Sequence, residues 1–448
     1  MSAPAHTLIY GFATTGQSVA RALTKRGRSV TIVDDHPSRA AREAAQLNAM
    51  NIVEAPSRAQ LARLVADVDA LAPSPGVPDL HPVFDAARAA DVPVISEFDL
   101  AREWDERPIV AITGTDGKTT VTAMVTGMLQ GSGFAAVAAG NDALPLVEAI
   151  DRDDVDVFVV EASSFRLGHT RRFTPSVATW LNFAPDHLDV HASLDAYEGA
   201  KARIWRDLSE DAAAVANADD PVVMRNRNQT LRAVTFATTR DADYRLDGEA
   251  LLGPEGVVVV RREQLWRDLP HDVSNALAAT ATSMAAGADL DAVRDVLRSF
   301  RGLPHRVELV GEFGGVRWYD DSKATVPHAT LAAARGFDSV VLIAGGRNKG
   351  LDLTPLTAVA DRLRAVVAIG EAADEVERAF RGRVPVDVVR TNIDDAVSAA
   401  ATASAPGDVV LLSPGCASFD WFTSYRNRGE AFRAAVARHF DMTPEAAR

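Results

Sequence analysis

Short apolar runs alternate with Ala- and Leu-rich stretches of helical periodicity along almost the whole chain. The apolar runs carry few polar residues on either face, which is typical of parallel strands covered by helices on both sides. Regular alternation of strands and helices predicts an α/β fold with doubly wound, mainly parallel sheets. The clearest predicted strands are Ile109–Thr113, Val157–Glu161, Val177–Asn182, Val340–Ala344, Val366–Ile369 and Val409–Leu412.

Two segments have the features of domain boundaries. A charged stretch over 104–108 precedes a new strand, and a predicted helix over 290–300 ends at Gly302-Leu303-Pro304, as a hinge would. Because 448 residues are too many for one ordinary core, we predict three domains. They comprise residues 1–106, 107–302 and 303–448, with a small hairpin inserted near 252–260.

Charge and cysteine content exclude several classes of function. The formal net charge of −14 argues against nucleic-acid and anionic-membrane partners, which need basic faces. No apolar stretch approaches the roughly 18 residues of a membrane span, and the N-terminus lacks the pattern of a signal peptide. Cys416 is the only cysteine, so an intrachain disulfide and a multi-cysteine zinc site are impossible. We therefore expect a soluble, cytoplasmic protein.

A phosphate-binding loop is the strongest single motif. The predicted strand Ile109–Thr113 leads into Gly114-Thr-Asp-Gly-Lys-Thr-Thr120, and a helical pattern follows. In this context backbone amides can cradle phosphates, Lys118 can neutralise the transferring group and Thr119 can bind Mg²⁺. Ile112 stands where the ordinary pattern has its first glycine. The alternative is a plain glycine turn with a surface lysine, and the strand–loop–helix context favours the phosphate loop.

A second glycine loop lies near the N-terminus. Gly11-Phe-Ala-Thr-Thr-Gly16 follows a strand and opens a helix, and Asp34-Asp35 ends the next predicted strand. The loop is similar to a dinucleotide fingerprint but lacks its middle glycine, so NAD binding is only one alternative. Binding of the ribose or pyrophosphate of another nucleotide is favoured.

The central region holds further candidates at strand ends. Glu161 closes a strand expected beside the phosphate loop, so its carboxylate can reach Mg²⁺. Asp186 and His187 follow another strand and could bind metal or substrate, although Asp186 is also a suitable helix cap. Lys201 lies on a predicted helix over 194–205, and on residue type alone it would be solvated.

Taken together, the motifs resemble those of the Mur ligases over essentially the whole chain, in family order. The Asp321–Thr325 string and the segment from Ser418 to Gly429 favour the branch that adds glutamate. The segments that carry the resemblance are Ser74–Gly76, Gly114–Thr120, Glu161–Phe165, Asp186–Asp189, Asn217–Pro221, His271–Ala278, Gly302–Arg306, Asp321–Thr325, Gly345–Gly350 and Ser413–Asp420.

The resemblance implies Rossmann-like N- and C-terminal domains around a central P-loop ATPase, and it assigns site residues. The UDP-sugar would be held by Asp34, Asp35, Ser74, Pro75, Gly76, Asn141 and Ser163. ATP would be held by Gly114, Thr115, Asp116, Gly117, Lys118, Thr119, Thr120, Asn275, Arg306 and Asp321. Glutamate would be held by Thr325, Lys349, Ser418 and Tyr425, and the catalytic set would be Lys118, Glu161, His187, Lys201 and Lys323.

The same resemblance implies the reaction and its cofactors. It implies ATP-driven addition of D-glutamate to UDP-N-acetylmuramoyl-L-alanine through an acyl phosphate, in peptidoglycan precursor synthesis and hence in cell shape and division. Two Mg²⁺ ions would be bound by Thr119, Glu161, His187 and Lys201, the last as a carbamate. We expect a monomer whose C-terminal domain closes over ATP through Arg306 at the hinge.

Several alternatives stay open on the sequence. A sibling Mur ligase or a folylpolyglutamate synthetase would share the phosphate loop and the acyl-phosphate chemistry. A non-catalytic module that senses UDP-sugars and a nicotinamide dehydrogenase are alternatives of other classes. The stereochemistry of the glutamate is also open, because D- and L-forms carry the same charges.

Five residues depart from the pattern of the family. Asp116, Asp272 and Val326 stand where asparagine is common, Arg166 where glutamine is usual, and Tyr425 where phenylalanine is frequent. None of these departures removes a charged catalytic group. They are therefore expected to affect substrate affinity and selection and to leave the type of reaction unchanged.

Overall fold

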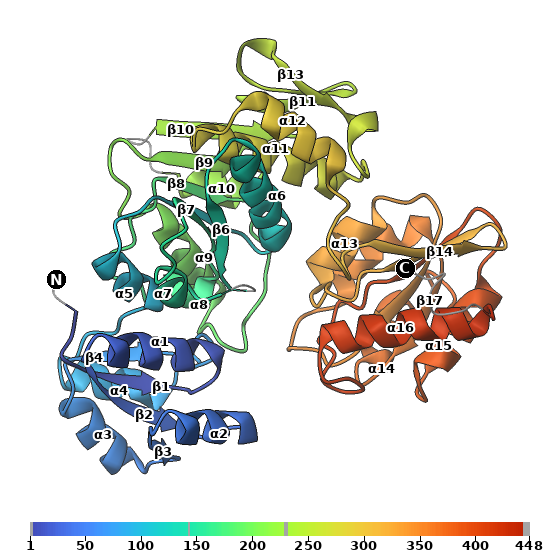
Figure 1. Cartoon of the computed structure of the whole chain (residues 1–448). Coiled ribbons are helices and arrows are strands. Elements are labelled where there is room, and N and C mark those ends of the chain that lie inside the picture. Colours follow the sequence, from blue (N-terminus) through green and yellow to red (C-terminus); the bar gives the residue numbers. More distant parts are fainter. Residues whose placement is uncertain (1–2, 142–143, 228–231, 442–448) are drawn as a thin grey trace. The chain divides into compact units, whose positions relative to one another are not determined.

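The computed structural model describes residues 3–141, 144–227 and 232–441 (Figure 1). The chain forms two compact units. The first unit comprises Met1–Phe183, Asp189–Leu265 and Ser274–Ser299, and the second unit comprises Ala184–Leu188, Trp266–Val273 and Phe300–Arg448. Each unit is built on strand–helix alternation, which confirms the predicted α/β class. The predicted boundaries at 106/107 and 302/303 stay predictions.

The first unit opens with a parallel sheet of four strands in the order β3-β2-β1-β4. Its strands are β1 (His6–Tyr10), β2 (Ser29–Asp34), β3 (Ile52–Glu54) and β4 (Ala70–Pro73). The helices of this region are α1 (Thr14–Lys25), α2 (Arg39–Leu47), α3 (Arg58–Ala66), α4 (Pro82–Ala89) and α5 (Glu97–Trp104).

The larger sheet of the first unit has nine strands in the order β13-β12-β11-β10-β9-β8-β5-β7-β6. All neighbours from β6 to β11 pair in parallel, and β12 and β13 form the antiparallel hairpin that the sequence predicted. The strands are β5 (Ile109–Thr113), β6 (Ala136–Gly140), β7 (Val157–Glu161), β8 (Val177–Trp180), β9 (Ala213–Asn217), β10 (Arg232–Ala237), β11 (Tyr244–Asp247), β12 (Ala250–Leu252) and β13 (Val258–Arg261).

Two predicted elements of this region end earlier than expected. The strand predicted to run to Asn182 stops at Trp180, because the chain there turns toward the phosphate loop. The helix predicted to run to Trp205 ends at Ala202 and continues as a single 3₁₀ turn. The helices are α6 (Lys118–Gly131), α7 (Leu146–Ala149), α8 (Ser164–Leu167), α9 (Leu194–Ala202), η1 (Arg203–Trp205), α10 (Pro221–Arg225), η2 (Pro254–Gly256), η3 (Arg262–Gln264), α11 (Pro270–Ala285) and α12 (Leu290–Ser299).

The second unit contains a sheet of six strands in the order β14-β15-β19-β16-β17-β18, parallel except for β14. The strands are β14 (Glu308–Phe313), β15 (Val316–Asp320), β16 (Val340–Gly345), β17 (Leu363–Ile369), β18 (Val386–Val389) and β19 (Val409–Leu412). The helices are α13 (Pro327–Ala334), η4 (Thr354–Arg362), α14 (Ala373–Phe380), α15 (Ile393–Ala403) and α16 (Tyr425–His439).

Strand β16 shows why these runs are apolar throughout. Val340, Leu342 and Ala344 belong to one hydrophobic cluster, whereas Val341 and Ile343 belong to another. Because successive side chains point to opposite faces, the sheet is buried on both sides, as the unbroken apolar pattern predicted. None of the described helices is long and apolar enough to span a membrane.

Candidate active site

The phosphate loop joins β5 to α6, as the sequence predicted. Gly117 caps α6 with φ +83°, and a Cβ added there would lie 2.5 Å from Asn275 Oδ1. The loop therefore needs glycine, because the conformation is left-handed and Asn275 leaves no room. Lys118 Nζ donates to the carbonyl oxygens of Gly114 and Thr115, both at 2.8 Å, so the amine lies against the loop.

Asn182 braces this loop from the end of the neighbouring strand β8. Its Oδ1 accepts from the backbone amides of Thr115 and Asp116 at 3.0 and 2.9 Å, and its Nδ2 donates to the Asp116 carbonyl at 3.2 Å. The sequence pattern assigns Asn182 no role. The contact depends on the parallel pairing of β5 with β8, which places residues 113 and 180 side by side. No local sequence pattern indicates it.

Lys201 is fully buried, with 1 % of its surface exposed. Its Nζ donates to the Gly114 carbonyl at 2.7 Å and lies 4.6 Å from the ring centre of Tyr197. The Tyr197 hydroxyl is 3.1 Å from Thr115 Oγ1. The expectation from residue type alone, a solvated lysine, is therefore wrong, and Lys118 and Lys201 converge on the same carbonyl oxygen.

Glu161 fits a cation site. It ends β7 in register with Ile112 of β5, is 3 % exposed, and its carboxylate accepts from Asn141 Nδ2 at 3.3 Å. Among the described residues, no cationic side chain forms an ion pair with this carboxylate. A buried anion without a counter-charge is costly, and carboxylate and hydroxyl oxygens are the ligands that Mg²⁺ prefers. Glu161 and Thr119, the second residue of α6, are thus a suitable donor set.

His187 and Lys349 are both grouped with the second unit, around Asp186. The Asp186 carboxylate accepts from the His187 amide at 2.7 Å, contacts His187 Nε2 at 3.1 Å and lies 3.8 Å from Lys349 Nζ. The interpretation of Asp186 as a helix cap is wrong, because no helix begins there. Its buried carboxylate links a predicted metal ligand to a predicted glutamate-binding lysine.

Two of the residues predicted to hold the UDP-sugar contact the N-terminal glycine loop. Asp34 Oδ2 accepts from the Phe12 amide at 2.7 Å, and Ser74 Oγ donates to the Gly11 carbonyl at 2.6 Å. Asp35 accepts from the Tyr10 hydroxyl at 2.8 Å. Pro75 and Gly76 continue the chain beyond β4, whereas Asn141 and the buried Ser163 follow β6 and β7.

Three loops of the second unit carry the residues predicted to bind glutamate. They follow β15, β19 and β16, which are adjacent parallel strands, so their carboxyl ends meet at one edge of the sheet. Lys323 Nζ lies 4.2 Å from the ring centre of Tyr425, the first residue of α16. Thr325, Lys349 and the buried Ser418 lie in these loops.

Asp321 and Arg306, predicted to bind ATP, also belong to the second unit. Asp321 is buried and accepts from Ser413 Oγ at 2.7 Å and from the Val307 amide at 3.2 Å. Burial raises the pKa of this carboxyl to about 7. Arg306 is half-buried and directly precedes Val307. Asp321 thus helps to set the backbone beside Arg306.

A buried arginine braces two of the predicted glutamate loops. Arg428, 1 % exposed, donates to Ser322 Oγ at 2.9 Å, to the Ser322 carbonyl at 2.8 Å and to the Cys416 carbonyl at 3.0 Å. Burial lowers its pKa to about 10. The Cys416 thiol is buried as well, which raises its pKa to about 12. Arg428 therefore joins the loop after β15 to the loop after β19.

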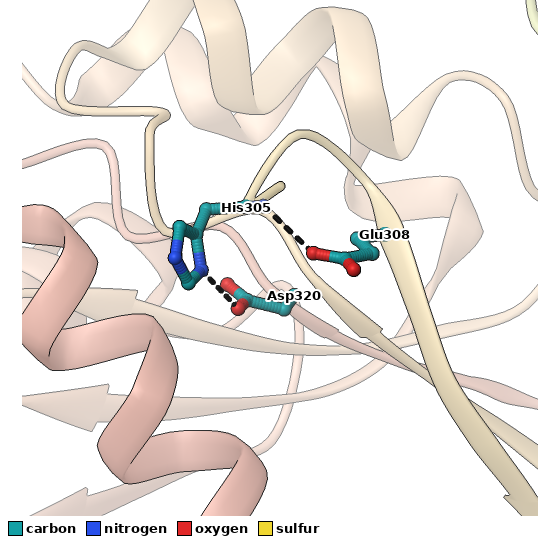
Figure 2. Close-up of side chains that lie close together, drawn as sticks. All are labelled: His305, Glu308 and Asp320. Atoms are coloured by element: carbon teal, nitrogen blue, oxygen red, sulfur yellow. Dashed lines mark hydrogen bonds and ion pairs between the residues drawn. The ribbon is translucent and has the colours of Figure 1, made fainter. Parts of the chain in front are cut away.

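Figure 2 shows a cluster of three side chains, His305, Glu308 and Asp320. His305 directly precedes Arg306 in the chain. His305 Nδ1 is 2.7 Å from Asp320 Oδ2, and the His305 amide donates to Glu308 at 2.9 Å. Arg433 of α16 pairs with Glu308 and lies 3.7 Å from Asp320. Because Arg433 already supplies a positive charge to the two carboxylates, we interpret the cluster as a set of structural ion pairs and not as a metal site.

We expect Gly429→Ala to destabilise the second unit by about 1–3 kcal/mol, the usual cost of overpacking. A Cβ at this position of α16 would overlap the His305 ring and lie 2.6 Å from Asp320 Oδ2. Helix propensity alone predicts the opposite sign. Urea unfolding measures the effect.

Gly199→Ala is the matched control, because a Cβ on this glycine of α9 would have no heavy atom within 4 Å. We expect it to stabilise the protein by roughly 0.5–1 kcal/mol. Equal stabilisation by both substitutions would contradict the close packing of α16 against His305.

Models of three protein-family domains match most of the chain. Residues 5–96 match the MurD-like N-terminal domain of Mur ligases, residues 112–283 the Mur ligase middle domain, and residues 305–416 the Mur ligase glutamate ligase domain. The chain is 37 % identical over 444 residues to the UDP-N-acetylmuramoylalanine–D-glutamate ligase of Geobacter metallireducens, covering 96 % of each chain. It is 41 % identical to the ligase of that name from Frankia casuarinae, covering 96 % of this chain and 93 % of that one.

Solved structures share the fold at lower identity. A pseudomurein peptide ligase type C from Methanothermus fervidus superposes with a TM-score of 0.62 at 16 % identity, over 97 % of this chain and 99 % of that one. The UDP-N-acetylmuramate–alanine ligase MurC of Thermotoga maritima gives 0.56 at 20 % identity, over 98 % of this chain and the whole of that one. With three matched domains and relatives of full length, the chain belongs to the Mur ligase family.

Proposed function

We propose that the protein is an ATP-dependent ligase that joins D-glutamate to UDP-N-acetylmuramoyl-L-alanine, in cytoplasmic peptidoglycan precursor synthesis. The observation that carries the proposal is the convergence of Lys118 and Lys201 on the Gly114 carbonyl, in a phosphate loop whose neighbouring strand ends at the buried Glu161. The relatives that bear this name cover the chain almost end to end. We further propose that the enzyme acts as a monomer.

The phosphoryl-transfer half of the reaction maps to the first unit. A carboxylate is a poor electrophile, so the alanine carboxylate of the substrate is first converted to an acyl phosphate by the γ-phosphoryl group of ATP. Transfer between anions needs charge neutralisation, which Lys118 and the backbone amides at the N-terminus of α6 supply. Mg²⁺ held by Thr119 and Glu161 would neutralise further charge on the phosphates.

The amide-forming half maps to the glutamate loops of the second unit. Lys349 pairs with a carboxylate of the incoming glutamate, and Thr325, Ser418 and Tyr425 complete its surroundings. The neutral amine then attacks the acyl carbon, and the tetrahedral intermediate expels phosphate and leaves the amide. Lys323, in van der Waals reach of Tyr425, places a second positive charge among these loops.

We also propose that Lys201 carries a carbamate and joins Thr119, Glu161 and His187 in holding two Mg²⁺ ions. The ammonium first loses one proton. The neutral amine then adds to CO₂, forming an N–C bond and releasing a second proton, which leaves an anionic carbamate. The nitrogen keeps one N–H, which can still donate to the Gly114 carbonyl that the lysine contacts. A carbamate oxygen is a hard ligand suited to Mg²⁺.

The deciding experiment is amino-acid-dependent formation of ADP with UDP-N-acetylmuramoyl-L-alanine, Mg²⁺ and ATP. We expect turnover with D-glutamate and much less with L-glutamate, with diamino acids or without an amino acid. Turnover with another amino acid, assayed with the UDP-precursor that matches it, would identify a sibling ligase. Glutamate-dependent turnover on a folate and none on the UDP-precursor would identify a folylpolyglutamate synthetase.

We expect Lys349→Ala to raise the apparent KM for glutamate roughly 10- to 100-fold, with a much smaller effect on the KM for ATP. The loss of a charged partner of a carboxylate typically costs about 1.5–3 kcal/mol. Ser418→Ala should act in the same direction. Steady-state kinetics with each substrate varied in turn measure the two constants.

Arg347→Ala is the matched control, because Arg347 lies in the same loop but its guanidinium pairs with Glu371 at the surface. Its glutamate KM should stay within about twofold of the unaltered value, as expected for an exposed ion pair. Equal losses of ATP and glutamate affinity in Lys349→Ala would show that Lys349 is wrongly placed in the glutamate site.

A further inference from the structure

Arg166 is a buried cation that reaches the N-terminal glycine loop from the central region of the first unit. It lies on the short helix α8 and is 5 % exposed. Its Nη2 donates to Thr15 Oγ1 at 2.9 Å, and its Nη1 lies 3.4 Å from Asn141 Oδ1. These contacts join residues that are far apart in the chain. Arg166 directly follows the Glu161–Phe165 segment, at a position where the family usually has glutamine.

A buried counter-charge holds the guanidinium in place. Arg166 Nε lies 3.0 Å from Glu97 Oε1, and Glu97 is 4 % exposed. Glu97 Oε2 accepts from the Val147 amide at 2.9 Å, which fixes the carboxylate in turn. Breaking such a pair from one side leaves an uncompensated buried charge, so Arg166 has one strongly favoured position.

The loop that Arg166 reaches is built for an anion. Thr15 is the second residue of α1, a helix of 12 residues whose N-terminus has no side-chain cap. Exposed amides and the helix dipole make such an N-terminus favourable for phosphate. Gly16 cannot carry a side chain, because a Cβ would overlap the Gly11 carbonyl. Glycine at this position is therefore required by the close packing of α1 against the preceding loop residue.

Arg166 also supplies the positive charge of this region. It lines a small cavity of about 10 Å³ together with Thr15, Gly16, Ser74 and its ion-pair partner Glu97, room for roughly one water molecule. Among the described residues that line this cavity, it is the only arginine or lysine. The other basic group there, His169, has its pKa lowered to about 4 by burial, so it is neutral at neutral pH.

We propose that Arg166 is a specificity-determining residue for the nucleoside diphosphate of the substrate: it brings a buried positive charge to the N-terminus of α1, where the diphosphate binds. Glutamine at this position could donate a hydrogen bond to Thr15 but would bring no charge. The inference rests on the proposed UDP-sugar substrate and adds a determinant of its affinity. Asn141 links the same guanidinium to Glu161, so the diphosphate site and the predicted metal site share one chain of hydrogen bonds.

The test is calorimetric titration of the full chain with UDP and, separately, with uridine, without ATP or amino acid. R166Q should bind UDP about 10- to 100-fold more weakly at low salt, as for the loss of a charge-assisted hydrogen bond, while uridine affinity changes less than about threefold. R166K should recover part of the difference, because it keeps the charge. The UDP affinity of the unaltered chain should also fall more steeply with salt than that of R166Q.

R26Q is the matched control. Arg26 follows the opposite end of α1 and pairs with Asp151 at 2.7 Å, so it joins the same two regions without approaching the glycine loop. R26Q should bind UDP as the unaltered chain does. If R166Q alone fails to fold, the double variant R166Q/E97Q removes both buried charges and should bind UDP weakly and uridine normally.

Two results would overturn the inference. If R166Q weakened UDP and uridine binding equally, the role of Arg166 would be purely structural. If R166Q bound UDP as tightly as the unaltered chain, Arg166 would not determine UDP affinity. These outcomes are distinct from failure of the proposed function. If the unaltered chain bound no UDP at all, the UDP-sugar assignment itself would be wrong. If UDP binding depended on Arg166 but no ligation occurred, only the reaction would be wrong.

Discussion

Lys118→Ala should abolish turnover, by at least about 100-fold, while the protein stays folded. The Lys118 ammonium donates to two carbonyl oxygens of its own loop at 2.8 Å, and it can exchange these contacts for phosphate oxygens. Losing one such charge at a phosphoryl-transfer site typically costs about 10²–10³ in kcat. The two lost hydrogen bonds should lower stability by only about 1–3 kcal/mol.

The measurement pairs ADP release with circular dichroism and thermal unfolding. Lys25→Ala is the control, since Lys25 is an exposed lysine paired with Asp151 at the far end of α1; it should keep full activity. A folded Lys118→Ala protein with unaltered turnover would remove the phosphate loop from the mechanism.

Lys201→Ala should be nearly inactive, again by at least about 100-fold, because it removes the anion proposed to bind Mg²⁺. The side chain is enclosed, so its removal also leaves a void beside Gly114. Acetate is small enough to occupy that void and supplies a carboxylate in place of the carbamate. We expect added acetate to raise the activity of Lys201→Ala at least about tenfold above that of the same variant without acetate. This is part of the roughly 100-fold loss expected from removing the charge.

Acetamide, which has the same shape and no charge, is the control and should not restore activity. A readout independent of turnover is ¹³C NMR with labelled bicarbonate, where the unaltered protein should show a carbamate carbon that Lys201→Ala lacks. Full activity of Lys201→Ala, or rescue by acetamide equal to that by acetate, would exclude the carbamate.

The phosphate loop could be predicted because its signal is local. Strand, glycines, lysine and helix follow one another within Ile109–Gly131, so the geometry of the loop depends on neighbours in the sequence. The position of Glu161 could be predicted for the same reason, because it depends only on where a local strand pattern ends. The predicted end of β8 at Asn182 was wrong, because Asn182 turns toward a loop almost 70 residues earlier in the chain.

The contacts that could not be predicted join residues that are distant in the sequence. Lys201 was expected to be solvated on residue type, and only the family resemblance pointed to the site, because its burial depends on how α9 packs beside the phosphate loop. The pairs Asp186–Lys349 and Arg166–Glu97 leave no local pattern either, since each depends on tertiary packing. Residue type predicts which chemistry is available, whereas packing decides which groups meet.

Because Cys416 is buried, its reaction with a thiol reagent can measure local opening of the second unit. The chain has no other cysteine. Its thiol is buried, which raises its pKa to about 12, and it lies in the loop after β19 that Arg428 joins to the loop after β15. A thiolate-selective reagent can therefore react only in molecules whose loops have separated. The labelling rate measures how often the loops proposed to bind glutamate open, and we expect bound amino acid to slow it, with no engineered label.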